Sequence, residues 1–371
     1  MKIAIITQQL GTNYGGILQA YALQCYLQNK GYQVEVVDYY GNKRVTIRIL
    51  LSIIKRFLKK YLMRQPIDFI APLWMYRKSF NYYYQYTFQF ISDNIAETPY
   101  IKNWQKLNKM GFDVFVVGSD QVWRPKNNRF TLPQMFLQFA KRENVKRIAY
   151  AASLGVSTWE YSPKQTKRLT PLAQRFDAIS VRESSAIELL KNKFHVSAMH
   201  VLDPTMLLDI SHYQRLLEQY PVISSAGNLF AYLLDLSEKK RQMIDRLSQQ
   251  TNSRPFNILP IDNQNYTNPM PSPAQWIRSF MDADFVFTDS FHGAVFSILF
   301  NKQFLIYGNK SRGIARFESL LDMFQIENRM VEKVDDIQIN LLQPIDYRKV
   351  NVLLNQYRAE AADFFQKAFS N

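Results

Sequence analysis

The stretch Lys2-Ile3-Ala4-Ile5-Ile6-Thr7 opens the chain with a nearly unbroken apolar run. Such a run is typical of a strand in a parallel sheet that is covered on both faces. A glycine-rich turn at residues 11–16 follows, then apolar residues at helical spacing up to Gly31, then a second strand pattern at residues 33–39. This strand–helix–strand unit predicts that the chain begins as a doubly wound α/β domain.

Further apolar runs bounded by turns predict two sets of strands. The first set continues at residues 112–117, 147–153, 178–181 and 199–202. The second set begins near Asn228, with strands at residues 229–234, 255–259, 284–288 and 303–307 and helices at residues 238–250 and 273–281. The predicted fold class is therefore α/β, with two Rossmann-like domains facing a cleft, which resembles the GT-B architecture. In such sheets ligands bind beyond the carboxyl ends of the strands.

The same patterns divide the chain into three parts. We expect an N-terminal Rossmann-like domain at residues 1–212, interrupted by a basic, aromatic insertion at residues 41–95. A C-terminal Rossmann-like domain is expected at residues 213–345. Residues 346–371 follow an amphipathic helical pattern, and this last helix can pack back on the N-terminal domain.

The composition is that of a globular protein with large cores, because 47% of the 371 residues are hydrophobic and 21% are charged. No apolar run reaches the ~18–20 residues that span a bilayer, and the first residues do not resemble a signal peptide. We therefore expect a cytoplasmic protein. The single cysteine, Cys25, excludes an intrachain disulfide. With four histidines and no CxxC or HxxxH spacing, we expect no metal and no cofactor.

The net charge of +15 is concentrated in one segment. Residues 41–90 contain ten Lys and Arg side chains but one acid, Asp68. Within this segment apolar residues from Ile47 to Leu62 follow helical spacing, and basic residues cover much of the remaining circumference. A basic amphipathic helix can lie on an anionic membrane surface, so residues 43–64 are a candidate contact with the inner face of the plasma membrane. The alternative is a helix whose charged face is simply solvated.

Polar turns follow three of the predicted strands and together suggest one cleft. Asp289-Ser290-Phe291-His292-Gly293 lies between a strand pattern and an apolar helix pattern. Gly118-Ser119-Asp120 and Asn13-Tyr14-Gly15-Gly16 follow two earlier strands in the same way. Free N–H groups at a helix start attract anions, and glycine lets a ligand approach the backbone. An imidazole can also exchange a proton near neutral pH, so the corner around His292 predicts an anion-binding catalytic site.

These segments resemble the polysaccharide pyruvyltransferase family. The matching segments follow the family's order between residue 1 and about residue 330, and they are residues 13–24, 117–123, 180–183, 202–205 and 288–293. Each segment alone is weakly specific, whereas five in order are specific to the family. They are less specific to a substrate.

The resemblance implies transfer of pyruvate from phosphoenolpyruvate to two hydroxyls of a sugar, which forms a cyclic ketal. Family acceptors are hexoses of bacterial surface polysaccharides, often while these are still linked to a lipid carrier. The reaction requires cations for the carboxylate and phosphate, an acid for the methylene carbon, and a base for the hydroxyls.

Candidate roles follow from the resemblance and this chemistry. The catalytic candidates are His292, Asp120 and Asp289. We expect the donor to bind on the side of the C-terminal domain, with the candidate contacts Arg182, His292, Ser290, Gly293, Arg312 and Arg316. We expect the acceptor to bind on the side of the N-terminal domain, with the candidate contacts Asn13, Tyr14, Gly15, Gly16, Ser119, Gln121 and Trp123.

The chain departs from the family at Ser290, where some relatives have an arginine. The donor pocket therefore has one cation fewer at this position, and Arg312 and Arg316 are the candidates to replace it. The departure leaves the donor itself open.

Each candidate residue also has a structural alternative. Asp120 and Asn13 are good N-caps, and Arg182 could form an ion pair with Glu183. Tryptophan such as Trp123 is mostly found in cores, and we interpret Asp203-Pro204 as a turn at a strand end rather than as part of the chemistry.

Two rival functions stay open beside the pyruvyltransferase. One is a glycosyltransferase of GT-B type that uses a nucleotide sugar. The other is a non-catalytic basic module that binds a membrane or nucleic acid. No nucleic-acid-binding motif accompanies the basic segment, so nucleic acid is not an expected partner.

Overall fold

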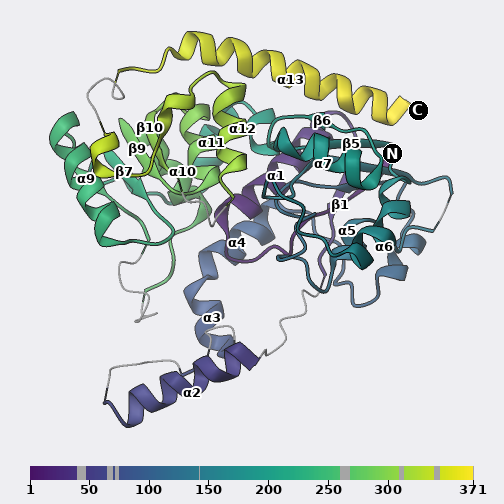
Figure 1. The fold of residues 1–371 in the computed structure, drawn as a ribbon, viewed down its shortest axis with the longest axis horizontal. Helices are drawn as coiled ribbons and strands as arrows, with labels where there is room; N and C mark the ends of the chain where they lie inside the picture. Colours follow the sequence, from purple (N-terminus) through teal and green to yellow (C-terminus); the bar gives the residue numbers. More distant parts are fainter. Residues whose placement is uncertain are drawn as a thin grey trace.

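Two parallel sheets organise the chain, and they lie side by side (Figure 1). The structure is a computed structural model, and it describes residues 1–39, 47–64, 70–71, 75–141, 143–259, 268–308, 313–337 and 343–370. The first sheet has the strand order β2-β1-β3-β4-β5-β6 and the second has the order β11-β10-β9-β7-β8. Two parallel-sheet α/β domains confirm the predicted fold class.

The strands of the first sheet are short and mostly buried, as their apolar runs predict. They are β1 (Lys2–Ile6), β2 (Gln33–Val36), β3 (Val114–Val117), β4 (Lys146–Ala152), β5 (Ala178–Val181) and β6 (Met199–His200). β1 lies between β2 and β3 and pairs in register with both, with Ile6 opposite Val117 at the carboxyl end. The second sheet contains β7 (Leu229–Tyr232), β8 (Pro255–Phe256), β9 (Phe285–Thr288), β10 (Gln303–Tyr307) and β11 (Met330–Val331).

The α-helices connect these strands or form additions to the domains. The helices of the N-terminal half are α1 (Tyr14–Asn29), α2 (Ile47–Tyr61), α3 (Arg77–Tyr83), α4 (Gln85–Asn94), α5 (Leu132–Met135), α6 (Pro163–Ala173), α7 (Ser185–Phe194) and α8 (Ile210–Leu217). Those of the C-terminal half are α9 (Glu238–Thr251), α10 (Pro273–Asp282), α11 (Phe291–Leu299), α12 (Ala315–Met323) and α13 (Tyr347–Ser370).

The strand predicted at residues 255–259 is shorter than expected. β8 lies at the edge of the second sheet and ends at Phe256. Beyond it the side chain of Asn257 accepts a hydrogen bond from the backbone N–H of Leu259 at 2.8 Å. This local turn replaces the pairing that a longer strand would need.

One apolar cluster includes residues from both domains and fixes their relative position. Tyr14 at the start of α1 packs against Trp276 of α10, with ring centroids 6.0 Å apart. Tyr213 of α8 packs against Phe296 of α11 at 5.2 Å. Because these contacts are buried, opening the cleft between the domains would expose apolar surface.

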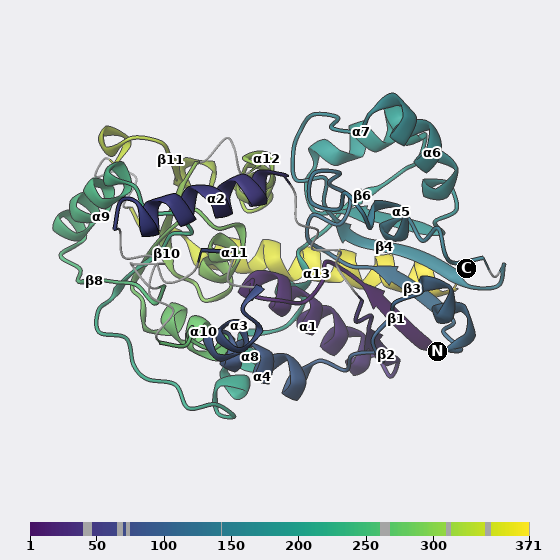
Figure 2. The same ribbon diagram turned by 90° about the horizontal axis from the view of Figure 1, so that it is seen from below.

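The last helix, α13, extends from the C-terminal domain to the N-terminal domain in both views (Figures 1 and 2). Phe365 stacks on Tyr150 of β4 with ring centroids 4.6 Å apart. Arg358 donates a hydrogen bond to the Met206 carbonyl and pairs with Asp209, each at 2.8 Å. The helix therefore contributes to the core of the N-terminal domain.

We predict that Phe365→Ala lowers the free energy of unfolding by about 3–5 kcal/mol, because it leaves a cavity against Tyr150. The control is Val352→Ala on the same helix, where the side chain is 68% exposed and the expected change is within about 0.5 kcal/mol. Urea denaturation measures both. Equal effects of the two substitutions would show that α13 is not part of the core.

Candidate functional site

The carboxyl ends of three strands and the starts of two helices meet between the domains. Asn13 caps α1, and its Oδ1 accepts a hydrogen bond from the Gly16 N–H at 3.2 Å. Ser290 caps α11, and its Oγ accepts from the Gly293 N–H at 3.4 Å. His292 lies in the first turn of α11, directly after β9, so the imidazole is carried to the domain boundary.

A buried carboxylate, Asp203, is the centre of the polar contacts at this boundary. It follows β6, and its Oδ1 accepts hydrogen bonds from the backbone N–H and hydroxyl of Thr205 at 3.0 and 2.8 Å. Its Oδ2 accepts from Ser119 Oγ at 3.1 Å and from Arg182 Nη1 at 2.9 Å. The sequence interpretation of Asp203 as a simple strand-end turn was therefore incomplete.

His292 reaches Asp203 from the other domain. Its Nε2 lies 3.6 Å from Asp203 Oδ2, and the ring is nearly buried. No hydrogen-bond partner of Nε2 is present among the described residues. The other side of the ring lies against Gly15, where a Cβ atom would come within 2.1 Å of Nδ1. Gly15 therefore makes room for the imidazole.

Arg182 connects Asp203 to a second carboxylate, Asp120. Arg182 Nη2 donates to Asp120 Oδ1 at 3.2 Å, and the guanidinium lies 4.4 Å from the ring centroid of Phe291. Asp120 follows β3 in the left-handed backbone region, with φ of 70°, which aspartate tolerates better than most residues. Its Oδ1 also accepts from the Gln121 N–H at 2.9 Å.

The cations around these carboxylates keep them ionised. Burial alone would raise the pKa of Asp203, but His292 and Arg182 hold it well below its ordinary value. Burial also acts to raise the pKa of Asp120, and Arg182, His292 and Arg316 outweigh it and lower this pKa. The site therefore has fixed negative charge next to the imidazole of His292.

A polar pocket of about 310 Å³ opens next to this cluster. The N-terminal domain contributes Gln8, Asn13, Asp120, Gln121, Arg124 and Asn127 to its wall. The C-terminal domain contributes Tyr232, Leu234, Asp289, Ser290, Phe291, His292 and Arg316. A ligand here would touch both domains at once.

Two guanidinium groups lie in the wall of this pocket, one from each domain. Arg124 is held by Glu160, with Nε and Nη2 each 3.0 Å from a carboxylate oxygen. Arg316 is buried and lies over Phe291 at 5.4 Å. Burial, and then repulsion from Arg182 and Arg124, lower the pKa of Arg316 to about 10, so it is still charged at neutral pH. An anion between these groups would relieve the repulsion.

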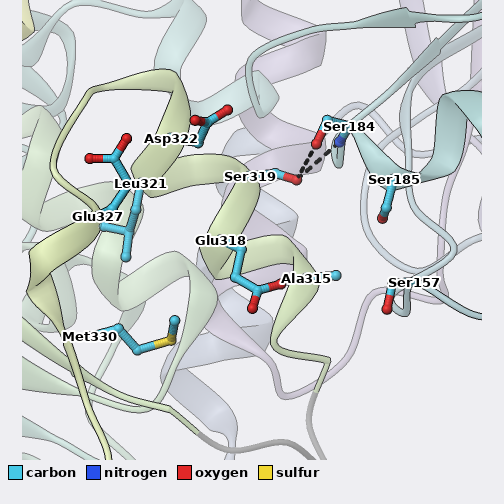
Figure 3. A pocket seen from close by; sticks show the side chains of 10 residues that line it. All are labelled: Ser157, Ser184, Ser185, Ala315, Glu318, Ser319, Leu321, Asp322, Glu327 and Met330. Carbon is cyan, nitrogen blue, oxygen red and sulfur yellow. Dashed lines mark hydrogen bonds between the residues drawn. The ribbon is translucent and has the colours of Figure 1, made fainter.

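A second pocket, of about 350 Å³, lies between the start of α7 and α12 (Figure 3). Ser319 of α12 accepts a hydrogen bond from the Ser184 N–H at 3.0 Å and joins the two domains there. Carboxylates and hydroxyls line this pocket, and its charged lining residues are Glu318, Asp322 and Glu327. It is therefore poorly suited to an anion. No group of three or more His, Cys, Asp or Glu in the described parts of the chain could hold a metal ion.

The structure brings several of the predicted residues together around the first pocket. They are Asn13, Asp120, Gln121, Ser290, His292 and Arg316. Gly15 and Gly16 lie beside them, since Gly15 contacts the His292 ring and Gly16 lies next to Asp120. Arg312 lies outside the described residues.

Arg182 and Ser119 require correction as ligand contacts. Both are buried and do not line the pocket. The Arg182 guanidinium is occupied by Asp120 and Asp203, and Ser119 donates its hydroxyl proton to Asp203. These two residues position the carboxylates instead.

Trp123 and Tyr14, the two aromatic residues among the expected acceptor contacts, are also wrong, because neither ring is accessible. Trp123 is 0% exposed, stacks on Phe136 with centroids 4.9 Å apart, and donates its N–H to the Met135 carbonyl. Tyr14 is buried at the domain boundary, and its hydroxyl donates to the Pro271 carbonyl at 2.6 Å.

Gly293 serves the fold of the corner, whereas Asp289 lines the pocket with its carboxylate already paired with Lys240. The Asp289 side chain is fully buried and accepts hydrogen bonds from the Leu234 N–H at 2.8 Å and from Lys240 Nζ at 2.6 Å. At Gly293 a Cβ atom would come within 2.3 Å of Thr288 Oγ1. Glycine is therefore required for close packing of helix on strand, not for access of a ligand.

Sequence reasoning missed Asp203, Gln8, Arg124 and Asn127. Gln8 lies two residues after the end of β1, so its place beyond a strand end was a usable signal. Arg124 and Asn127 lie four and seven residues after Asp120 in the same loop. Their approach to the pocket depends on the path of that loop, which no periodicity encodes.

We predict that Gly15→Ala strongly disturbs the domain boundary, because the new methyl group would overlap the His292 ring. The matched control is Gly16→Ala, where the nearest atom is 3.7 Å away and a helical alanine is tolerated. Thermal unfolding should show that Gly15→Ala lowers the free energy of unfolding by about 2 kcal/mol or more and that Gly16→Ala does not lower it. Equal stability of both variants would contradict this packing.

We predict that Asp203→Asn lowers the free energy of unfolding by about 3–5 kcal/mol at neutral pH, because Arg182 loses a buried partner. The pKa of Asp203 is lower in the folded chain, so its stabilisation is complete above the unfolded value of about 3.9 and is lost as pH falls below it. The difference in free energy of unfolding between Asp203→Asn and wild type should therefore be constant around neutral pH and become smaller in acid.

The control for this substitution is Asp209→Asn, which removes an exposed pair with Arg358 and should change stability by about 1 kcal/mol or less. Urea denaturation across a pH series measures both variants. If the loss of unfolding free energy in Asp203→Asn became larger toward acid pH, Asp203 would not be a stabilising ionised carboxylate.

The fold is shared with sugar-nucleotide enzymes of very different sequence. UDP-GlcNAc 2-epimerase from Neisseria meningitidis bound to UDP-GlcNAc is similar with a TM-score of 0.53 and 10% identity, covering 99% of this chain and 100% of that one. Arabidopsis thaliana UGT89C1 complexed with UDP-L-rhamnose has a TM-score of 0.50 and 10% identity, covering 100% and 97%. These likenesses confirm the GT-B-like fold alone. No curated protein matches the chain by sequence.

The family model described as polysaccharide pyruvyl transferase matches residues 13–311, which include both sheets apart from β1 and β11 and nearly all of the pocket described above. Arg316 and Gln8 lie just outside the matched range. The chain therefore belongs to the polysaccharide pyruvyl transferase family, and it is a transferase that carries pyruvate to a polysaccharide.

Proposed function

We propose that the protein transfers pyruvate from phosphoenolpyruvate to two hydroxyls of a hexose in a bacterial surface-polysaccharide intermediate and forms a cyclic ketal. The observation that supports this most is the pocket between the domains, where Arg316, Arg124 and His292 converge. Phosphoenolpyruvate carries a phosphate and a carboxylate, and guanidinium groups match both. The family match supports the pyruvyl group as the part transferred.

In this proposal Arg316 is the main cation for the donor. Its place beside Phe291 and its lowered pKa both indicate a charge that an anion would stabilise. Arg316 then compensates for Ser290, the position where some relatives have an arginine. Ser290 and Asn13 can add hydrogen bonds from helix starts, where backbone N–H groups favour an anion.

His292 is the proposed proton donor. The methylene carbon of the enol phosphate takes a proton and becomes a methyl group, which leaves an oxocarbenium-like centre at the carbon that carries phosphate. One sugar hydroxyl adds to that carbon, and the second hydroxyl displaces phosphate by breaking the carbon–oxygen bond. The two hydroxyl protons balance the new methyl hydrogen and the proton on the released phosphate.

Asp203 and Asp120 have different proposed roles. Asp203 lies 3.6 Å from the imidazole and is kept ionised, and its proposed role is to position the His292 ring. Asp120 lines the pocket, and both of its hydrogen bonds given above use Oδ1. Its second oxygen is the proposed acceptor for a proton from the sugar hydroxyl.

The acceptor is proposed to be a hexose of a capsule or exopolysaccharide intermediate that is still carried on a lipid. It would enter from the side of Asn13 and Gln121, because these side chains line the pocket on the N-terminal domain. A lipid-linked acceptor places the reaction at the inner face of the plasma membrane. Residues 43–64 are the proposed contact with that surface, and residues 43–46 lie outside the described chain.

We predict that the protein releases phosphate from phosphoenolpyruvate only when a sugar acceptor is present. His292→Gln should lower kcat about 10²–10⁴-fold, since it removes the proton donor. Arg316→Gln should raise KM for phosphoenolpyruvate about 10–100-fold, since it removes a charged contact. The control is Arg348→Gln, whose side chain is 95% exposed and should have no effect.

The assay is phosphate release and acceptor mass gain over a panel of lipid-linked galactosides, mannosides and glucosamines. The rival result is a thermal shift with a uridine or guanosine diphosphate sugar and none with phosphoenolpyruvate. That result would favour a glycosyltransferase and overturn the proposal.

A further inference from the structure

The exposed apolar surface of the described chain is concentrated in one segment. Of the nineteen large hydrophobic side chains that are exposed, twelve lie between residues 50 and 86. Eight of these belong to α2 and the two residues after it, and each is between 44% and 73% exposed; they are Leu50, Leu51, Ile54, Phe57, Leu58, Tyr61, Leu62 and Met63. A soluble surface rarely presents a patch of this kind without a partner.

The exposed residues form one face of α2. At 100° per residue, Leu51, Ile54 and Leu58 fall within a narrow arc of the helix. Lys55 and Lys59 lie at the edge of that arc, and further basic residues cover the opposite side. No acidic residue occurs between residues 47 and 64.

This helix is held away from the body of the molecule. Figure 1 shows α2 at the end of a limb that continues through α3 and α4, apart from both sheets. The limb is rooted at the boundary of the two domains: the Met270 N–H donates to the Tyr83 carbonyl at 2.7 Å, and Phe90 packs against Tyr21 of α1 at 5.8 Å. Binding through α2 would therefore fix the distance of the pocket from a surface.

We propose that the apolar face of α2 inserts into the interface of an anionic lipid membrane. A helix with this division of apolar and basic residues and little net hydrophobicity lies in the plane of the interface, with its lysines extended toward the head groups. The charge excludes the other obvious occupant, a second copy of α2, because two such helices would bring like charges together with no acid to pair them.

An electrostatic and an apolar contribution to membrane binding can be measured separately. Anionic lipid attracts the basic side, at about fivefold in binding per Lys or Arg near the surface. The apolar side contributes about tenfold per inserted leucine or isoleucine at the lower end of the range for burial. The electrostatic part is screened by salt, whereas the apolar part is not.

The experiment is sedimentation of the full chain with vesicles of phosphatidylcholine alone or mixed with phosphatidylglycerol. The wild-type protein should bind the mixed vesicles and bind the neutral ones much more weakly. Its binding to the mixed vesicles should weaken between about 0.1 M and about 1 M salt, because the Debye length falls from ~10 to ~3 Å. The variant Leu51→Gln, Ile54→Gln, Leu58→Gln should lose binding to both kinds of vesicle. Lys55→Gln with Lys59→Gln should lose about 25-fold on mixed vesicles alone.

The matched control is Ile223→Gln with Val352→Gln, which removes apolar side chains that are even more exposed and lie far from α2 in the sequence, and it should leave binding unchanged. Wild-type protein that stays in solution with mixed vesicles at low salt, or a triple variant that binds like wild type, overturns the proposal. So does a triple variant whose only effect is to dissociate an oligomer in sedimentation without vesicles.

Docking is independent of the chemistry proposed for the pocket. With a water-soluble acceptor, the triple variant should release phosphate from phosphoenolpyruvate at the wild-type rate. Vesicle binding without phosphate release would refute the proposed function but support membrane docking. Phosphate release without vesicle binding would support the proposed function but refute membrane docking.

Discussion

The buried carboxylate of Asp203 is the interaction on which the domain boundary depends. It accepts hydrogen bonds from Arg182, Ser119 and Thr205 within the N-terminal domain, and it faces His292 of the other domain at 3.6 Å. An isolated buried charge would be strongly unfavourable, and His292 and Arg182 offset the burial and keep the carboxylate ionised. Since the imidazole belongs to the second domain, the position of the catalytic candidate is coupled to how the domains pack.

Other buried acids on both sides of the pocket are also paired with a cation or with backbone N–H groups. Asp289, next to the helix that carries His292, is neutralised by Lys240 and by a backbone N–H. Glu183, beside Arg182, accepts hydrogen bonds from the N–H groups of Leu154 and Gly155 after β4. These buried acids hold the strand ends in place. Arg124, Arg316 and Asp120 line the pocket itself, where Arg124 is paired with Glu160 and Asp120 with Arg182.

The fold could be predicted from the sequence because its signals are local. Apolar runs such as those of β1 and β9 and the glycine-rich helix starts specify both sheets and the order of their elements. The site was predicted less well, because its geometry depends on packing between distant segments. Asp203 and His292 are far apart in the chain, and Trp123 is close to Asp120 in sequence but points into the core. Which of two neighbouring polar residues faces the pocket is decided by tertiary contacts that a single sequence does not display.

We propose that an anionic donor is bound between the domains by Arg316 and Arg124, next to the His292 imidazole and Asp203. A crystal structure of the protein with phosphoenolpyruvate tests it most directly. We expect the phosphate and carboxylate to contact Arg316, Arg124 and the start of α11, with the methylene carbon facing His292 and the Arg182–Asp203 pair intact. Donor density in the acidic pocket beside α12, or density held by an Arg182 that has left Asp203, would contradict it.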